Sequence, residues 1–100
     1  MARERREQNR LRLPDETVDF IRSLHPDIKR KMKAALRTIL SDPVAGKSLR
    51  EELAGLRSYR VGRFRIIYRS PGRGVIEIVA IGPRKIIYEK TYRLVKRSLK

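Results

Sequence analysis

The chain has 100 residues, the size of one domain, and 40% of them are hydrophobic, which is enough for a modest core. Its formal net charge is +15, from 26 basic and 11 acidic residues, and it contains no cysteine. The composition therefore excludes disulfides and zinc–thiolate sites and fits a reducing cytoplasm. It also points to a polyanionic partner, which could be RNA, DNA, an anionic membrane or an acidic protein.

The positive charge is concentrated in the second half of the chain. Residues 1–52 hold 13 basic and 9 acidic residues, whereas residues 53–100 hold 13 basic residues and only Glu77 and Glu89. Repulsion at this density destabilises the compact state, and a bound polyanion would relieve it. The first dozen residues lack the apolar region of a secretory signal, and no apolar run approaches the roughly 20 residues that cross a bilayer. We therefore expect one domain over residues 1–100 that does not associate with membranes.

The first half of the chain predicts a basic tail, a short strand and two helices. The tail covers residues 1–9, and the strand covers Arg10–Leu13. Pro14 suits the first turn of a helix over residues 14–24, where apolar residues recur every three or four positions. A second apolar stripe predicts a helix from Pro26 to residue 40, and the pair should form an antiparallel hairpin.

The second half begins with a loop that holds one helical turn around residues 49–53. Residues on the two faces then alternate in type along the chain, which is typical of strands. The predicted elements are strands over residues 58–61, 64–69 and 75–81, turns at residues 62–63 and 70–74, and a terminal helix over residues 86–99. The order β-α-α-β-β-β-α predicts an α+β domain. Its helical hairpin packs on one face of a twisted antiparallel sheet, and its other face is only partly covered. Outward side chains such as Arg60 and Arg65 should converge on that second face.

The sequence lacks the residue sets of familiar hydrolases. The single histidine, His25, lies between the two helices, where a turn or capping role is expected, and no metal cluster is visible, so we expect neither metal nor cofactor. Arginine and tyrosine remain. A cluster of Arg65, Arg84 and Tyr88 could cleave RNA with the 2′-hydroxyl of the substrate as nucleophile. The plainer alternative is that the arginines only solvate a sheet face and that Tyr88 belongs to the core.

Two segments carry a resemblance to a known family. The stretch "YRVGRFRIIY" at residues 59–68, followed by "VIEIVAIGPRKIIY" at residues 75–88, resembles the RelE/ParE superfamily of toxins from toxin–antitoxin pairs. The preceding stretch "DPVAGKSLREELAGL" at residues 42–56 resembles the segment that leads into the sheet in that family. The resemblance covers about residues 10–96. It implies one of two activities. RelE-like members are mRNA interferases that cut codons in the ribosomal A site by 2′-hydroxyl attack, whereas ParE-like members inhibit DNA gyrase and are not nucleases.

The resemblance also implies roles for individual residues. Carried over by position, Arg65 and Arg84 would hold and stabilise the scissile phosphate, and Tyr88 would transfer a proton or stack on a base. Pro83 stands where some members have a histidine, which leaves Tyr88 with more of the proton transfer. Other basic residues are expected to contact RNA: Arg57, Arg60, Arg63, Lys85, Lys47 and Arg50.

Three hypotheses follow, and the first is favoured. The chain is a ribosome-dependent mRNA interferase, a gyrase inhibitor of the ParE type, or a basic binding module without activity. On either toxin reading the expected partner is a cognate antitoxin with an acidic toxin-binding segment. The first hypothesis adds mRNA and the ribosome as partners in the cytoplasm, and the second replaces them with DNA gyrase.

Overall fold

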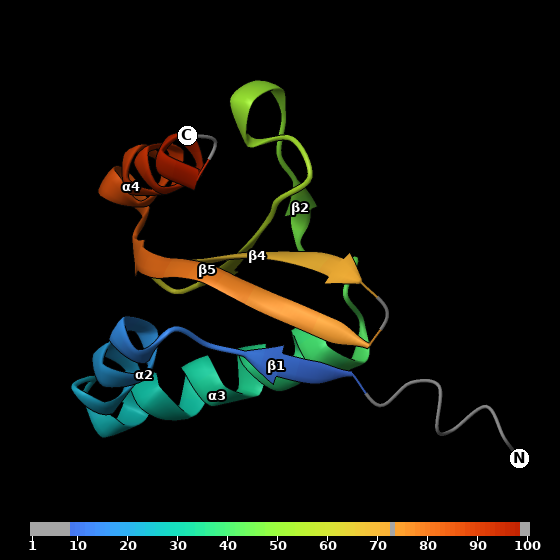
Figure 1. Cartoon of the computed structure of the whole chain (residues 1–100). Helices are drawn as coiled ribbons and strands as arrows, with labels where there is room; N and C mark the ends of the chain where they lie inside the picture. The colour runs from blue at the N-terminus through green and yellow to red at the C-terminus, as the bar shows by residue number, and fades with distance from the viewer. Residues whose placement is uncertain (1–8, 73, 99–100) are drawn as a thin grey trace, which may run out of the picture.

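The computed structural model describes residues 9–72 and 74–98 and contains a five-stranded sheet with helices on both faces (Figure 1). Residues 1–8 of the predicted basic tail lie outside the described residues. Its last residue, Asn9, belongs to the fold, because its Nδ2 donates a hydrogen bond of 2.8 Å to the carbonyl of Leu40. No helix in the described ranges is long and apolar enough to span a membrane.

Helices α2 (Asp15–Arg22) and α3 (Pro26–Ser41) form the predicted hairpin and cover one face of the sheet (Figure 1). Acidic residues in the first turn of α2 face the positive end of its dipole. His25 is the N-cap of α3, and its Nδ1 accepts the amide proton of Asp27 at 3.3 Å. The expectation that the only histidine has a capping role is confirmed.

The sheet is mixed rather than wholly antiparallel. Its order is β1-β5-β4-β3-β2, and β1 pairs parallel to β5 while the other neighbours are antiparallel. A parallel pair needs a long connection, which the helices and the meander supply here. The strands are β1 (Arg10–Arg12), β2 (Lys47–Ser48), β3 (Arg57–Val61), β4 (Phe64–Gly72) and β5 (Val75–Pro83).

Several boundaries differ from the predicted ones because partner strands decide them. The two-residue strand β2 was not predicted, and β4 continues to Gly72 through the segment expected to be a turn. Strand β5 runs to Pro83, because Phe64 and Arg65 of β4 pair with Pro83 and Gly82. Helix α4 (Arg84–Ser98) therefore starts two residues before its first apolar residue. The helical turn predicted around residues 49–53 is present as the 3-10 segment η1 (Glu51–Leu53).

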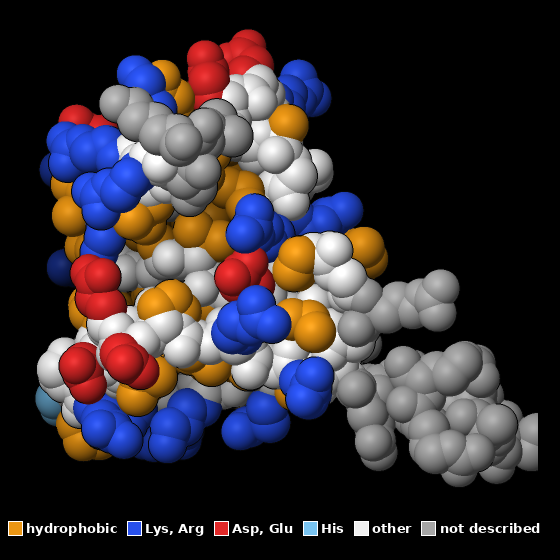
Figure 2. All heavy atoms as spheres, in the orientation of Figure 1, with side chains coloured by type: hydrophobic (Ala, Val, Ile, Leu, Met, Phe, Trp, Pro, Cys, Tyr) orange, Lys and Arg blue, Asp and Glu red, His pale blue; other side chains and the backbone are white. Residues whose placement is uncertain are grey.

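Two apolar clusters lie on opposite faces of the sheet. The larger one packs the hairpin against the sheet around fully buried residues such as Met32, Ile39 and Ile66. The smaller one packs α4 and the η1 segment against the other face, which is the face that the sequence predicted to be only partly covered. Figure 2 shows hydrophobic side chains in the space between α4 and the sheet, with Lys and Arg around them and acidic groups over α2 and η1. The buried members of the smaller cluster are Leu56, Ile67, Ala80 and Ile87.

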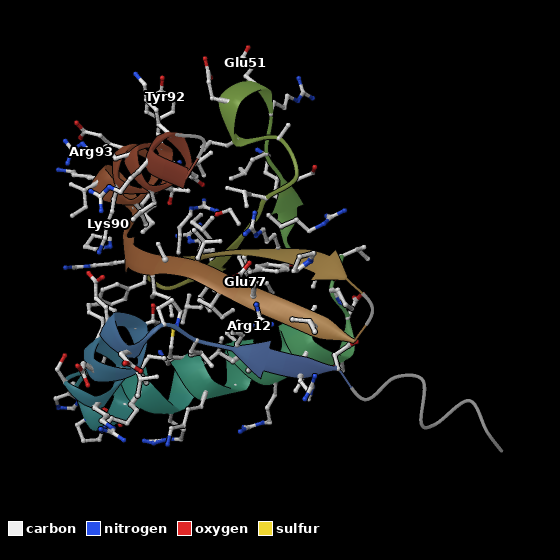
Figure 3. The ribbon with its side chains drawn as sticks, viewed as in Figure 1. Arg12, Glu51, Glu77, Lys90, Tyr92 and Arg93 are labelled. Atoms are coloured by element: carbon white, nitrogen blue, oxygen red, sulfur yellow. The ribbon has the colours of Figure 1, made fainter. Side chains whose placement is uncertain are left out.

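Polar contacts also join the layers. Lys90 extends from α4 toward the hairpin (Figure 3), and its Nζ lies 3.2 Å from Oε2 of Glu16 on α2. On the sheet, Glu77 lies between Arg69, at 2.6 Å, and Arg12, at 3.8 Å. Helix α4 packs over β5 and β4, with its N-terminus at the end of the sheet where the β3–β4 hairpin turns.

Candidate functional site

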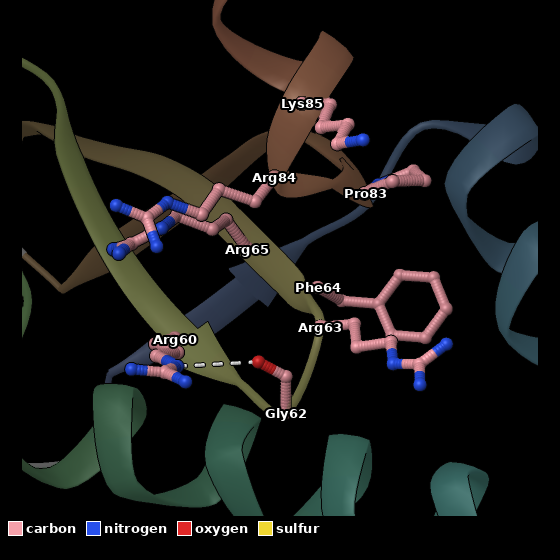
Figure 4. A pocket seen from close by; sticks show the side chains of 8 residues that line it. All are labelled: Arg60, Gly62, Arg63, Phe64, Arg65, Pro83, Arg84 and Lys85. Carbon is pink, nitrogen blue, oxygen red and sulfur yellow. Dashed lines mark hydrogen bonds between the residues drawn. The ribbon is translucent and has the colours of Figure 1, made fainter.

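A pocket of about 370 Å³ lies where the β3–β4 hairpin meets the start of α4 (Figure 4). Five of its eight lining residues are cations and none is acidic. In Figure 4 the side chains of Arg65 and Arg84 extend in the same direction, whereas Arg63 and Lys85 point to the opposite side. The lining residues are Arg60, Gly62, Arg63, Phe64, Arg65, Pro83, Arg84 and Lys85.

Strand pairing brings these residues together from two parts of the sequence. Arg60 pairs directly with Arg65 across the hairpin, so both project from the same face of the sheet. On its other side Arg65 pairs with Gly82, two residues before Arg84. The amide of Arg84 donates a hydrogen bond of 3.1 Å to the carbonyl of Arg63, which fixes the start of α4 against the hairpin turn.

The hairpin turn itself depends on Gly62. Val61 pairs with Phe64, so Gly62 and Arg63 form a two-residue loop. Gly62 has a φ of 60°, in the region that favours glycine and that the first position of a type II′ turn requires. Arg60 adds a hydrogen bond of 3.2 Å from its Nε to the carbonyl of Gly62, which holds its guanidinium against the turn.

Arg65 is connected to Tyr88 through Ser58. Nη1 of Arg65 donates to Oγ of Ser58 at 3.3 Å, and the same Oγ lies 3.0 Å from the hydroxyl of Tyr88. Ser58 is 2% exposed, and Tyr88 is half-buried in the cluster beneath α4. The structure thus brings Arg65, Arg84 and Tyr88 to one end of α4, although Tyr88 does not line the pocket directly.

Among the described residues, no carboxylate pairs with a pocket cation. Within residues 9–72 and 74–98, no ion pair involves Arg65 or Arg84, and the Nε of Arg65 is buried without a hydrogen-bond partner. Two unit charges about 4 Å apart interact by about 1 kcal/mol in water and about 4 kcal/mol at the effective dielectric of a protein surface. A phosphate between two guanidinium groups turns that repulsion into attraction. The site is therefore arranged to bind an anion.

Three residues expected to contact RNA lie elsewhere. Arg57 projects from the opposite face of β3, and its Nη1 donates to the carbonyls of Gly46 at 2.7 Å and Val44 at 3.4 Å. Lys47 and Arg50 line a separate hollow at the β2 edge of the sheet. The pocket therefore gathers only Arg60, Arg63 and Lys85 from that predicted set.

Ser58 is the site residue that sequence reasoning missed. Its signal was weak, since a small polar residue on the α4 side of a strand looks like any outward position. In the described part of the chain, no group of three or more His, Cys, Asp and Glu side chains could hold a metal ion.

Comparison with known proteins gives one family match. A family model described as the ParE toxin of the type II toxin–antitoxin system parDE matches residues 5–88. A search of curated proteins finds no match.

Solved structures are similar to this chain over most of its length. A RelBE toxin–antitoxin complex from Mycobacterium tuberculosis has a TM-score of 0.65 at 28% identity, covering 77% of this chain and 99% of the other. A variant of Escherichia coli RelE in the free state, in which alanine replaces two arginines, has a TM-score of 0.71 at 14% identity. The match covers 93% of this chain and 99% of the other. An archaeal RelE–RelB complex from Pyrococcus horikoshii has a TM-score of 0.62 at 22% identity, covering 77% and 96%. The last two show a shared fold.

Proposed function

This chain belongs to the ParE toxin family of type II toxin–antitoxin systems, and from that premise we propose that it is a ribosome-dependent mRNA interferase. It has the fold of RelE toxins. The observation that carries the proposal is the pocket at the N-terminus of α4, where Arg65 and Arg84 meet without a carboxylate and Tyr88 is connected to Arg65 through Ser58.

The chemistry follows from these side chains. The 2′-oxygen of the substrate forms a bond to the adjacent phosphorus, and the bond from phosphorus to the 5′-oxygen breaks, which leaves a cyclic phosphate and a free 5′-hydroxyl. The phosphorus centre carries extra negative charge in the transition state, which Arg65 and Arg84 stabilise. Tyr88 moves a proton between the 2′-hydroxyl and the leaving oxygen. Nucleophile and phosphate both come from RNA, so the reaction needs no further group.

Removal of one pocket arginine or of the tyrosine hydroxyl tests this site. We expect Arg84→Ala to reduce cleavage of mRNA on translating ribosomes about 100- to 1000-fold, the usual loss for one transition-state donor. Tyr88→Phe should reduce it about 100-fold or more. Arg37→Ala, on the exposed side of α3, is the matched control and should cleave as the unsubstituted chain does. Unchanged cleavage in both pocket variants, with folding intact, would contradict the site.

A second candidate function has one observation in its favour, which is that the matching family model is the ParE toxin. On that alternative the basic surface binds DNA gyrase and no RNA is cut. A supercoiling assay with purified gyrase, run beside mapping of mRNA 5′ ends after induced expression, separates the two. Gyrase inhibition without cuts inside codons would replace the first proposal, and the absence of both effects would favour a basic binding module.

The proposed partner is a cognate antitoxin. Two of the similar structures are complexes of a toxin with its antitoxin. For this chain the net charge of +15 favours an acidic toxin-binding segment that neutralises the pocket. Expression without the antitoxin should arrest growth, and co-expression should relieve the arrest. A ribosomal target would place the activity in the cytoplasm.

A further inference from the structure

Ser58 occupies a position where a hydroxyl is costly unless it is paired. It is 2% exposed and pairs with the fully buried Ile67 on the sheet face beneath α4. A buried hydroxyl without a partner costs about 1–3 kcal/mol, and alanine would occupy the same place without that cost. Among the described residues, both hydrogen bonds of the Ser58 side chain go to site residues: Arg65 on β4 and Tyr88 on α4.

The donor and acceptor capacity of Ser58 restricts what these contacts can be. An arginine only donates, so Oγ of Ser58 accepts the proton from Nη1 of Arg65. The serine keeps one proton and one lone pair for Tyr88. When Tyr88 is a neutral phenol it can donate to Ser58, and when it has lost its proton only Ser58 can donate. The same positions of the heavy atoms therefore serve both protonation states of Tyr88.

We propose that Ser58 is a positioning residue for RNA cleavage, which holds the Tyr88 hydroxyl at a fixed place relative to Arg65 while that hydroxyl gains and loses its proton. The inference rests on the proposed function. It differs from a purely structural role in one respect: the effect of Ser58 on the rate passes through Tyr88. Donation from Arg65 also polarises the serine hydroxyl, which strengthens its hydrogen bond to the phenol oxygen.

The contact can be measured without any RNA. The carbon that bears the hydroxyl in Tyr88, labelled with ¹³C and assigned with the Tyr88→Phe variant, should change its NMR chemical shift in Ser58→Ala and recover in Ser58→Thr. Ser70→Ala is the matched control, because it removes the hydroxyl of another serine on β4, which donates to the backbone carbonyl of Val75 on β5. That variant should leave the Tyr88 signal in place. An unchanged signal in Ser58→Ala would overturn the proposal.

The role in cleavage is tested with a double-mutant cycle. Ser58→Ala should lower the single-turnover rate on ribosome-bound mRNA about tenfold, with the half-saturating concentration changed less than about twofold. In a Tyr88→Phe background the same substitution should cost less than about twofold. Ser58→Thr, which keeps the hydroxyl, should stay within about threefold of the unsubstituted chain. Ser58→Cys, which is close in size but a weaker hydrogen-bonding group, replaces Ser58→Ala if that variant does not fold.

The outcomes separate this inference from the proposed function. An additive loss in the Tyr88→Phe background means that Ser58 acts on Arg65 or on the fold, and it overturns the positioning role alone. A loss in Ser58→Thr as large as in Ser58→Ala does the same. Failure of the unsubstituted chain to cleave mRNA overturns the proposed function, and the role of Ser58 in the reaction with it.

Discussion

At the scale of single residues, Tyr68 fixes the loop between α3 and β2. Its hydroxyl accepts the amide proton of Gly46 at 2.9 Å and donates to the carbonyl of Pro43 at 2.7 Å. A Cβ at position 46 would lie 2.6 Å from that hydroxyl, so the close approach requires glycine. Arg57 holds the carbonyl of Gly46 at 2.7 Å. Side chains rather than regular secondary structure therefore order this loop.

The hydroxyl of Tyr68 should contribute stability that depends on pH. We expect Tyr68→Phe to lower the free energy of unfolding by about 1–3 kcal/mol near neutral pH, because the Gly46 amide loses its acceptor. Burial raises the pKa of Tyr68, although the Gly46 hydrogen bond and the charge of Arg57 oppose the shift. The unfolded phenol then ionises first, at pH about 10, so this contribution is complete below that pH and is lost as pH rises toward the folded pKa.

Urea unfolding at pH 8 and near pH 10.5 checks this expectation. The gap in unfolding free energy between the unsubstituted chain and Tyr68→Phe should narrow at the higher pH. Tyr92→Phe, at a residue 38% exposed on α4, is the control and should change the unfolding free energy little at either pH. A gap of equal size at both pH values would mean that the Tyr68 hydroxyl does not titrate in this way.

At the scale of elements, the β3–β4 hairpin sets the geometry of the pocket. Arg60, Gly62, Arg63 and Arg65 all belong to this hairpin and all line the pocket. The turn requires a positive φ at Gly62, and no atom would obstruct a Cβ there. Any cost of a side chain at position 62 is therefore backbone strain rather than a clash.

We expect Gly62→Ala to lower the free energy of unfolding by about 1–2 kcal/mol, the cost of a left-handed conformation for an L-residue. It should also reduce RNA cleavage, because the turn positions Arg60 and Arg63. Gly55→Ala imposes similar strain at a φ of 92° outside the pocket, so it should destabilise the chain and leave cleavage intact. Denaturant unfolding and the cleavage assay, run on both variants, separate strain from function. Equal losses of cleavage in the two would contradict a specific role of the hairpin turn.

The elements that the sequence predicted well are those with a local pattern. The apolar stripe of α3 gave a helix from Pro26 to residue 40, and the structure has Pro26–Ser41. Strand β2 and the end of β4 were missed because they exist through pairing with a neighbouring strand. The start of α4 at Arg84 follows from the length of β5, which the hydrophobic pattern alone does not show.

The same distinction applies to the candidate site. The resemblance pointed to Arg65 and Arg84, and antiparallel pairing of β4 with β5 explains why they meet. The contact between Ser58 and Tyr88 spans 30 residues and depends on how α4 packs on the sheet. Periodicity reports which face a side chain is on, but not which side chain of another element it meets. For that reason the sequence did not show that Arg57, which was expected to contact RNA, lies on the opposite face and donates to the carbonyl of Gly46.

At the scale of the whole molecule, the ion pairs of the described residues lie away from the pocket. Glu77 contacts Arg69 and Arg12, and Glu16 contacts Lys90. Most of these side chains are exposed, and such pairs contribute about 0–1 kcal/mol each, so they balance charge locally more than they stabilise the fold. Among the described residues no carboxylate pairs with the pocket cations, so on the proposed function their contact with RNA should depend strongly on salt.

Salt dependence measures how many of these cations contact phosphate. If all five pocket cations bind single-stranded RNA, at about −0.7 each, the logarithm of the affinity should fall against the logarithm of salt with a slope of about −3.5. The Tyr88→Phe chain suits this measurement because it keeps every cation while its chemistry is slowed. Fluorescence anisotropy between 50 and 200 mM salt, with no ribosome present, would give the slope.

In that background, Arg63→Ala should make the slope less steep by about 0.7, because one phosphate contact and its released counterion are lost. Arg37→Ala, on the exposed side of α3, should leave the slope unchanged even though it removes the same charge. The comparison therefore separates phosphate contact from net charge, which both variants alter equally. Equal reductions would mean that RNA responds to the net charge of the whole molecule, and no change in either would mean that Arg63 does not contact phosphate.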